Sequence, residues 1–120
     1  MDSAEITPPG ASPEDARARL LRVELDRMVS WLVVTYGARQ VILFGSMAGG
    51  RIGAWSDLDL VVVKDTPLRF MDRIAEIIEK VRPRVGVDLL VYTPAEWQLV
   101  QERRFAREEI LGRGRILHAA

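Results

Sequence analysis

Residues 41–46 read Val-Ile-Leu-Phe-Gly-Ser and predict a buried strand that ends in a tight turn. The first four residues are apolar and partly β-branched, which favours a strand covered on both faces. Gly45 lets the backbone approach a ligand closely, and residues from Ser46 to Gly50 can open a short helix. The free N–H groups at the start of such a helix attract phosphate, and the Ser46 hydroxyl adds a donor. The turn therefore predicts an anion site built mostly from backbone.

Two acidic side chains follow at the start of the next predicted strand. Ten residues separate Ser46 from the stretch Asp57-Leu58-Asp59-Leu60-Val61-Val62-Val63. Because side chains alternate along a strand, Asp57 and Asp59 share one face. Two like charges separated by one residue repel each other, and a bound cation explains why both are present. Carboxylate oxygens are hard ligands, so we expect Mg²⁺, with Mn²⁺ as the alternative metal.

A third acid lies in another apolar run, residues 85–91, which reads Val-Gly-Val-Asp-Leu-Leu-Val. Aspartate is disfavoured in strands and costly to bury alone, so Asp88 needs a compensating contact. If this strand lies beside the strand of Asp57 and Asp59, Asp88 completes a cluster of three carboxylates that can hold two metal ions. Two ions about 3.5–4 Å apart can clamp the attacking and leaving oxygens of an in-line displacement.

Taken in order, these motifs resemble the minimal nucleotidyltransferases of the DNA polymerase β superfamily. The resemblance is carried by the Phe-Gly-Ser end of the first strand, by Ser-Asp-Leu-Asp-Leu at residues 56–60 and by Val-Asp-Leu-Leu at residues 87–90. Residues 109–117 look like the short final strand of that family. The resemblance implies a polymerase β-like nucleotidyltransferase fold and transfer of AMP from ATP to a hydroxyl acceptor.

The resemblance also implies roles for individual residues. Asp57 and Asp59 would hold both magnesium ions, and Gly45 and Ser46 would bind the triphosphate. Asp88 would ligate the catalytic metal and help to activate the acceptor hydroxyl. Because phosphoryl transfer depends mostly on positioning and charge neutralisation, loss of one of these acids should remove most of the activity.

One part of the family pattern is absent. Family members often carry arginines directly after the Gly-Ser pair, whereas residues 47–50 read Met-Ala-Gly-Gly in this chain. Arg51 and Lys64 are the candidates for a substitute phosphate ligand. The absence of the arginines favours a second hypothesis, in which the chain neutralises a partner by occlusion and its nucleotide pocket is degenerate. The three intact aspartates favour the enzyme.

A protein partner is implied by the resemblance as well. In similar bacterial and archaeal proteins the small transferase is commonly encoded beside a helical HEPN toxin and acts as its antitoxin, in some cases by modifying a toxin tyrosine with AMP. An exposed apolar patch would fit such a complex, with Trp55 and Trp97 as its candidate aromatic residues.

Composition narrows the classes of protein to which the chain can belong. The chain has 120 residues, which suits one domain, and we expect a flexible leader over residues 1–11 before a nucleotidyltransferase domain over 12–120. A formal net charge of zero provides no basic field for nucleic acid. The absence of cysteine excludes thiol nucleophiles and cysteine-based zinc sites, and the single histidine, His118, close to the C-terminus argues against a serine–histidine triad. Without a signal-peptide pattern or a membrane-length apolar run, we expect a cytoplasmic protein.

The apolar periodicity predicts an α/β (α+β) domain with a small mixed sheet and helices mainly on one face. Helices are expected over residues 12–36, capped by Ser12, over 68–81, and over 94–107, capped by Thr93. No Walker or dinucleotide-binding glycine pattern is present.

Overall fold

The computed structural model describes residues 13–49 and 57–120. The predicted leader, the Ser12 cap, Arg51 and Trp55 therefore lie outside the described residues. In chain order the elements are α1 (Pro13–Ser30), the π-helical segment η2 (Trp31–Tyr36), β1 (Gln40–Phe44), α2 (Gly45–Ala48), β2 (Leu58–Val63), α3 (Phe70–Val81), β3 (Val87–Tyr92), α4 (Pro94–Val100), the π-helical segment η3 (Ala106–Gly112) and β4 (Arg115–Ala119).

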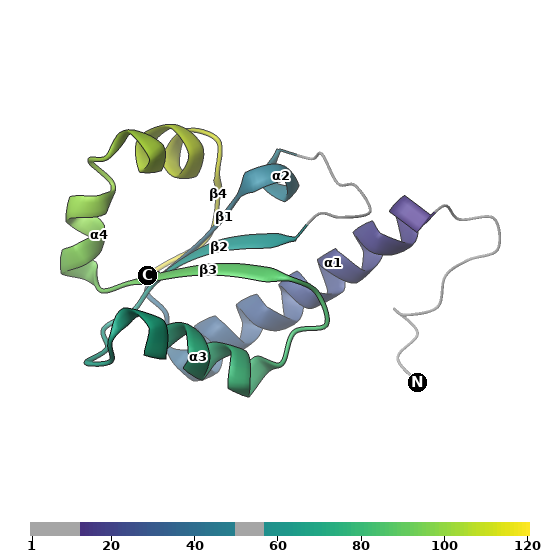
Figure 1. The fold of residues 1–120 in the computed structure, drawn as a ribbon, viewed down its shortest axis with the longest axis horizontal. Helices are drawn as coiled ribbons and strands as arrows, with labels where there is room; N and C mark the ends of the chain where they lie inside the picture. Colours follow the sequence, from purple (N-terminus) through teal and green to yellow (C-terminus); the bar gives the residue numbers. More distant parts are fainter. Residues whose placement is uncertain (1–12, 50–56) are drawn as a thin grey trace.

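The four strands form one mixed sheet in the order β3-β2-β1-β4 (Figure 1). Strand β1 pairs antiparallel with both β2 and β4, while β2 and β3 run parallel. Helix α3 makes the crossover between the two parallel strands, as such a pair requires. The mixed sheet confirms the predicted fold class.

The two longest helices cover one face of this sheet. Alternate strand residues such as Val41, Leu60 and Val91 are buried there, together with Met28 of α1 and Ile77 of α3. The amphipathic spacing of both helices explains this packing, because their apolar positions fall on one side. Helix α1 with η2 ends at Tyr36, as predicted, and α3 ends at Val81, as predicted.

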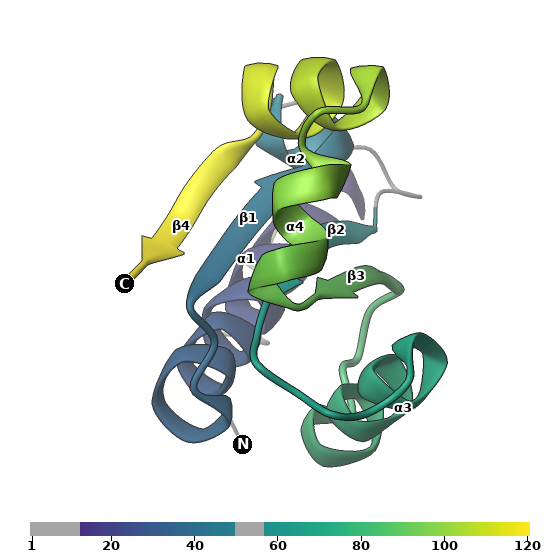
Figure 2. The ribbon, with the colours of Figure 1, turned by 90° about the vertical axis from the view of Figure 1, so that its left-hand side faces the viewer.

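The opposite face carries the shorter helical segments (Figure 2). Ile42 and Val61 of the sheet pack there against Trp97 of α4 and against Ala106 and Ile110 of η3. The expectation that Trp97 belongs to an exposed patch is therefore wrong, since its side chain is buried in this second cluster.

The third helix is shorter than predicted. Thr93 does cap α4, in a capping box with Glu96, but the helix ends at Val100 and a second helical segment begins at Ala106. A straight helix would carry Ala106 about 13 Å along its axis from Trp97, yet both side chains pack in one cluster. The final strand begins at Arg115, and residues 109–112 are helical. The strand predicted over residues 109–117 was therefore placed too early.

None of the helices described in residues 13–49 and 57–120 combines the length and the apolar character needed to cross a membrane.

Candidate functional site

Two of the three predicted acids lie side by side at the start of the parallel strands. In the β2–β3 register Asp59 is opposite Asp88, and in the β1–β2 register Asp59 is opposite Phe44. By alternation Asp59 lies on the same face as Val61, which packs against η3 and α4. That cover does not extend over the first residues of β3, where Asp88 is exposed. The sheet therefore presents two carboxylates at an accessible end.

The predicted anion-binding turn lies directly against Asp59. Gly45 follows Phe44 and begins α2, with a φ of +76° that L side chains rarely adopt. A Cβ built on Gly45 would lie only 2.2 Å from Asp59 Oδ2. The half-buried Ser46 is the next residue of the same turn. Glycine thus meets both a backbone requirement and a spatial one, and the backbone turn lies in contact with the carboxylate.

The electrostatics of Asp59 reflect this crowding. Burial, a side-chain hydrogen bond with Asp88 and the charges of Asp88 and Asp57 raise the pKa of Asp59 to about 6. A carboxyl group whose ionisation is opposed by burial and by neighbouring acids is a common feature of functional sites, because a bound cation relieves the repulsion.

Asp57 makes contacts different from those of this pair. Its carboxylate lies against Gly86, where a built Cβ would be 2.5 Å from Asp57 Oδ1. The same oxygen forms an ion pair of 3.6 Å with Arg17 Nη2, which reaches it from α1. Asp59 contacts the turn at Gly45, so the two carboxylates lean toward different neighbouring strands.

The donor set suits a hard divalent cation, because Asp59 and Asp88 present adjacent carboxylate oxygens. The structure does not gather all three acids into one group. Among the described residues, no three His, Cys, Asp or Glu side chains are arranged to hold a metal ion. The predicted cluster is therefore present as a pair, with Asp57 engaged by Arg17.

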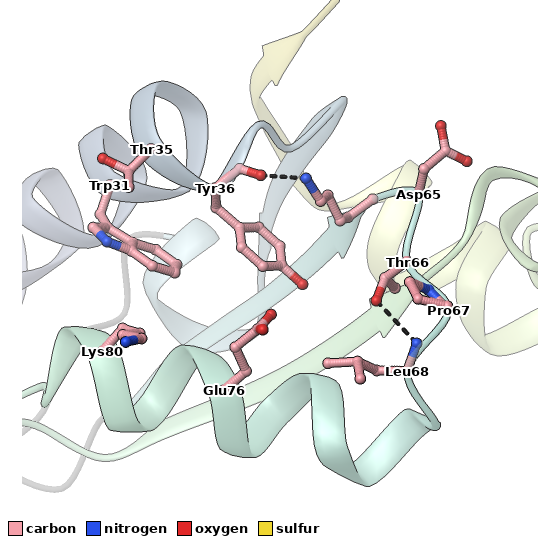
Figure 3. Close-up of a pocket in the computed structure, with 10 residues that line it drawn as sticks. Trp31, Thr35, Tyr36, Asp65, Thr66, Pro67, Leu68, Glu76 and Lys80 are labelled. Carbon is pink, nitrogen blue, oxygen red and sulfur yellow. Dashed lines mark hydrogen bonds between the residues drawn. The ribbon is translucent and has the colours of Figure 1, made fainter.

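Lys64 does not serve as a phosphate ligand in this arrangement. It follows the far end of β2, five residues and roughly 16 Å of extended chain from Asp59. Its ammonium group donates to the Tyr36 carbonyl and lies 4.8 Å from the centre of the Tyr36 ring. Both residues line a cavity of about 440 Å³ between η2 and α3, with Trp31 and Glu76 (Figure 3). Lys64 belongs to this second cavity and not to the aspartate site.

Arg17 is the charged neighbour of the site that the sequence analysis missed. Its position in the first predicted helix carries no motif, and no periodicity relates it to Asp57. Only the tertiary structure, which places the N-terminal part of α1 on the side of the molecule where β2 begins, brings the two together (Figure 1).

Comparisons with known proteins address the family. A comparison with curated proteins finds no match. Among solved structures, the chain is similar to the crystal structure of a candidate nucleotidyltransferase from Sulfolobus solfataricus, with 20% sequence identity and a TM-score of 0.47. The similarity covers 77% of this chain and 85% of that one.

The family assignment rests instead on a sequence match. Residues 25–116 match the nucleotidyltransferase domain family. This range contains Gly45, Ser46, Asp57, Asp59 and Asp88. The chain therefore belongs to the nucleotidyltransferase domain family.

Proposed function

We propose that the chain transfers AMP from ATP to a hydroxyl group of a partner protein, with Mg²⁺ or Mn²⁺ as the cofactor. The observation that carries the proposal is the pair of Asp59 and Asp88, placed in register on parallel strands, with Asp59 against the glycine turn at Gly45. An anion-binding turn beside paired carboxylates is the combination that metal-assisted nucleotidyl transfer requires.

Each residue has a distinct task in this proposal. Asp59 and Asp88 would hold two metal ions together with Asp57, whose carboxylate would have to leave its ion pair with Arg17, and the ions would neutralise charge on the phosphates. The backbone at Gly45 and the Ser46 hydroxyl would orient the triphosphate. Asp88, the exposed member of the pair, would accept the proton of the acceptor hydroxyl. The acceptor oxygen then forms a bond to the α-phosphorus, and the bond to the pyrophosphate leaving group breaks.

For the partner we propose a helical HEPN-type toxin, which the chain would neutralise as an antitoxin. The support is the family resemblance of the motifs, together with apolar side chains exposed near the C-terminal end. These are Phe105, Leu111 and Ile116. Large apolar side chains that are exposed are available to contact a protein partner.

The test is transfer of label from α-³²P-ATP, with Mg²⁺, to the protein encoded by the adjacent reading frame. The variant is the double substitution Asp57→Asn and Asp59→Asn, and the matched control is Asp26→Asn, an exposed carboxylate on α1. We expect label on the partner with the wild type and the control, and none with the double variant.

The other outcomes have definite meanings. Equal labelling by the double variant contradicts the role of the aspartates. A stable complex without label favours the alternative function, an antitoxin that binds and occludes its partner. The observation that favours this alternative is the engagement of Asp57 by Arg17.

A further inference from the structure

We propose that Arg17 is a positioning residue that holds the Asp57 carboxylate over Gly86 and competes with a divalent cation for that carboxylate. The inference deepens the proposed function and rests on it, because it assumes that the aspartates bind metal. It concerns a residue outside the range 25–116 that matches the family.

The first observation is the placement of the guanidinium group. Arg17 Nη2 lies 3.6 Å from Asp57 Oδ1. The Arg17 side chain is only 23% exposed, so its long stem is packed against the protein, whereas the Asp57 side chain is 49% exposed. Figure 1 shows the N-terminal half of α1 on the side of the molecule where β2 and β3 begin. The helix thus delivers a fixed cation to a carboxylate that remains open to solvent.

The second observation is the space at Gly86. The Gly86 carbonyl accepts a hydrogen bond of 3.0 Å from the Leu58 amide, which fixes the backbone beside Asp57. Because Gly86 has no side chain, the Asp57 carboxylate can lie across the start of β3 at 2.5 Å from where a Cβ would be. The space at Gly86 accommodates the Asp57 carboxylate, and Arg17 of α1 forms an ion pair with the same group.

The charge of Arg17 affects both the repulsion among the aspartates and the binding of a metal ion. Asp57, Asp59 and Asp88 repel one another at one end of the sheet, and the Arg17 cation offsets part of that repulsion while no metal is bound. A divalent cation that binds Asp57 is repelled by Arg17 and must share or displace it. Removal of the Arg17 charge should therefore strengthen metal binding, in contrast to the loss expected if Arg17 were a structural residue only.

The experiment measures Mn²⁺ affinity without nucleotide, by the electron paramagnetic resonance signal of free Mn²⁺ at pH 8. The proteins are the wild type, Arg17→Gln, Arg17→Lys and Arg22→Gln, the last being an exposed arginine on the same helix. We expect Arg17→Gln to bind Mn²⁺ about fivefold to tenfold more tightly. Arg17→Lys keeps the charge and should stay near the wild type, as should Arg22→Gln. Thermal unfolding of each protein verifies that it is folded.

A double-mutant cycle tests whether the effect passes through Asp57. In the Asp57→Asn background, Arg17→Gln should change Mn²⁺ affinity much less than in the wild type, because the shared carboxylate is gone. An effect of equal size in both backgrounds would overturn the inference, since it would show a general field effect.

Two further results distinguish a failure of the inference about Arg17 from a failure of the proposed function. If the wild type binds Mn²⁺ and Arg17→Gln binds it equally or more weakly, the inference about Arg17 is wrong and the proposed function stands. If neither the wild type nor any variant binds Mn²⁺ while all are folded, the metal role of the aspartates is wrong and both proposals fail.

Discussion

At Gly45 the chain combines a left-handed backbone conformation with close contact to a carboxylate. Its φ is +76°, and a Cβ would lie 2.2 Å from Asp59 Oδ2. We expect Gly45→Ala to lower the free energy of unfolding by at least about 2 kcal/mol, from backbone strain and displacement of Asp59. It should also weaken ATP binding.

Urea unfolding and ATP titration provide the measurements for this substitution. Gly49→Ala is the matched control, because Gly49 has a φ of −80°, which alanine adopts without strain. If Gly45→Ala is as stable as Gly49→Ala and binds ATP equally well, the turn does not depend on glycine.

We expect Asp59 to be required for activity but to lower the stability of the folded protein. Its folded-state pKa of about 6 lies above its ordinary value of 3.8, so the folded protein loses stability as the pH rises from about 4 to about 6. Asp59→Asn removes this cost and can still donate a hydrogen bond to Asp88. We expect the variant to be about 1–2 kcal/mol more stable than the wild type at pH 8 and to transfer no label.

Urea unfolding at pH 4 and pH 8 measures the predicted effect on stability. The gain should be small at pH 4, where Asp59 is protonated in the folded wild type, and full at pH 8. A variant that is less stable than the wild type at pH 8, or one that retains near wild-type transfer, contradicts the assignment of Asp59.

At the scale of elements, one ion pair joins α3 to the start of α4. The Arg73 side chain is buried and donates to both Glu96 carboxylate oxygens and to the Leu68 and Val91 carbonyls. Glu96 also accepts from the Thr93 amide in the capping box. The hydrogen bond from Arg73, and then the one from Thr93, lower the pKa of Glu96 to about 2. Formation of α4 is thus coupled to α3.

The coupling predicts a loss of stability in acid. Because the folded-state pKa of Glu96 lies below its ordinary 4.5, this stabilisation is present above about pH 4.5 and is lost as the pH falls toward 2. Glu96→Gln preserves a capping-box side chain and removes the charge. We expect a cost of about 1 kcal/mol at pH 7, since the half-exposed Glu96 side chain is screened by solvent.

Thermal unfolding across pH 2–7 checks this prediction, with the exposed Glu102→Gln as the control. The difference between Glu96→Gln and the wild type should shrink as the pH falls below 4.5. A difference that does not depend on pH would show that the Glu96 charge does not contribute.

At the scale of the whole molecule, Glu24 connects the N-terminal helix to the chain between α3 and β3. Its side chain is completely buried, accepts two hydrogen bonds of 3.0 Å from Arg27 and accepts others from the Arg84 backbone and side chain. Arg27 in turn donates to the Val81 and Arg82 carbonyls. Segments that are far apart in the sequence therefore share one polar network beside the core.

Removal of the buried Glu24 carboxylate takes away the acceptor of these hydrogen bonds and the charge that offsets Arg27. We expect Glu24→Ala to destabilise the fold by about 3–5 kcal/mol, measured by urea unfolding. Glu79→Ala, at an exposed position of α3, should change stability by less than about 0.5 kcal/mol. Similar stabilities for the two variants would contradict the role of the network.

Several features of this fold follow from short-range patterns. The apolar run before Gly45 forms β1, the helical spacing before Tyr36 forms α1 and η2, and Thr93 caps α4. Such features depend on neighbouring residues, so propensity, periodicity and capping chemistry are sufficient to predict them. The prediction that Asp88 lies beside Asp59 needed the family resemblance as well, because strand order is not a local property.

The sequence by itself determined the first three strands, the glycine turn and the residue types of the acid site, because apolar runs and turn residues are local signals. Only the tertiary structure decided that α4 ends before η3, that Trp97 is buried, that Lys64 belongs to another cavity and that Arg17 contacts Asp57. The physical reason is that these contacts join residues far apart in the chain. Their partners are set by how helices pack on the two faces of the sheet, and no local pattern encodes that packing.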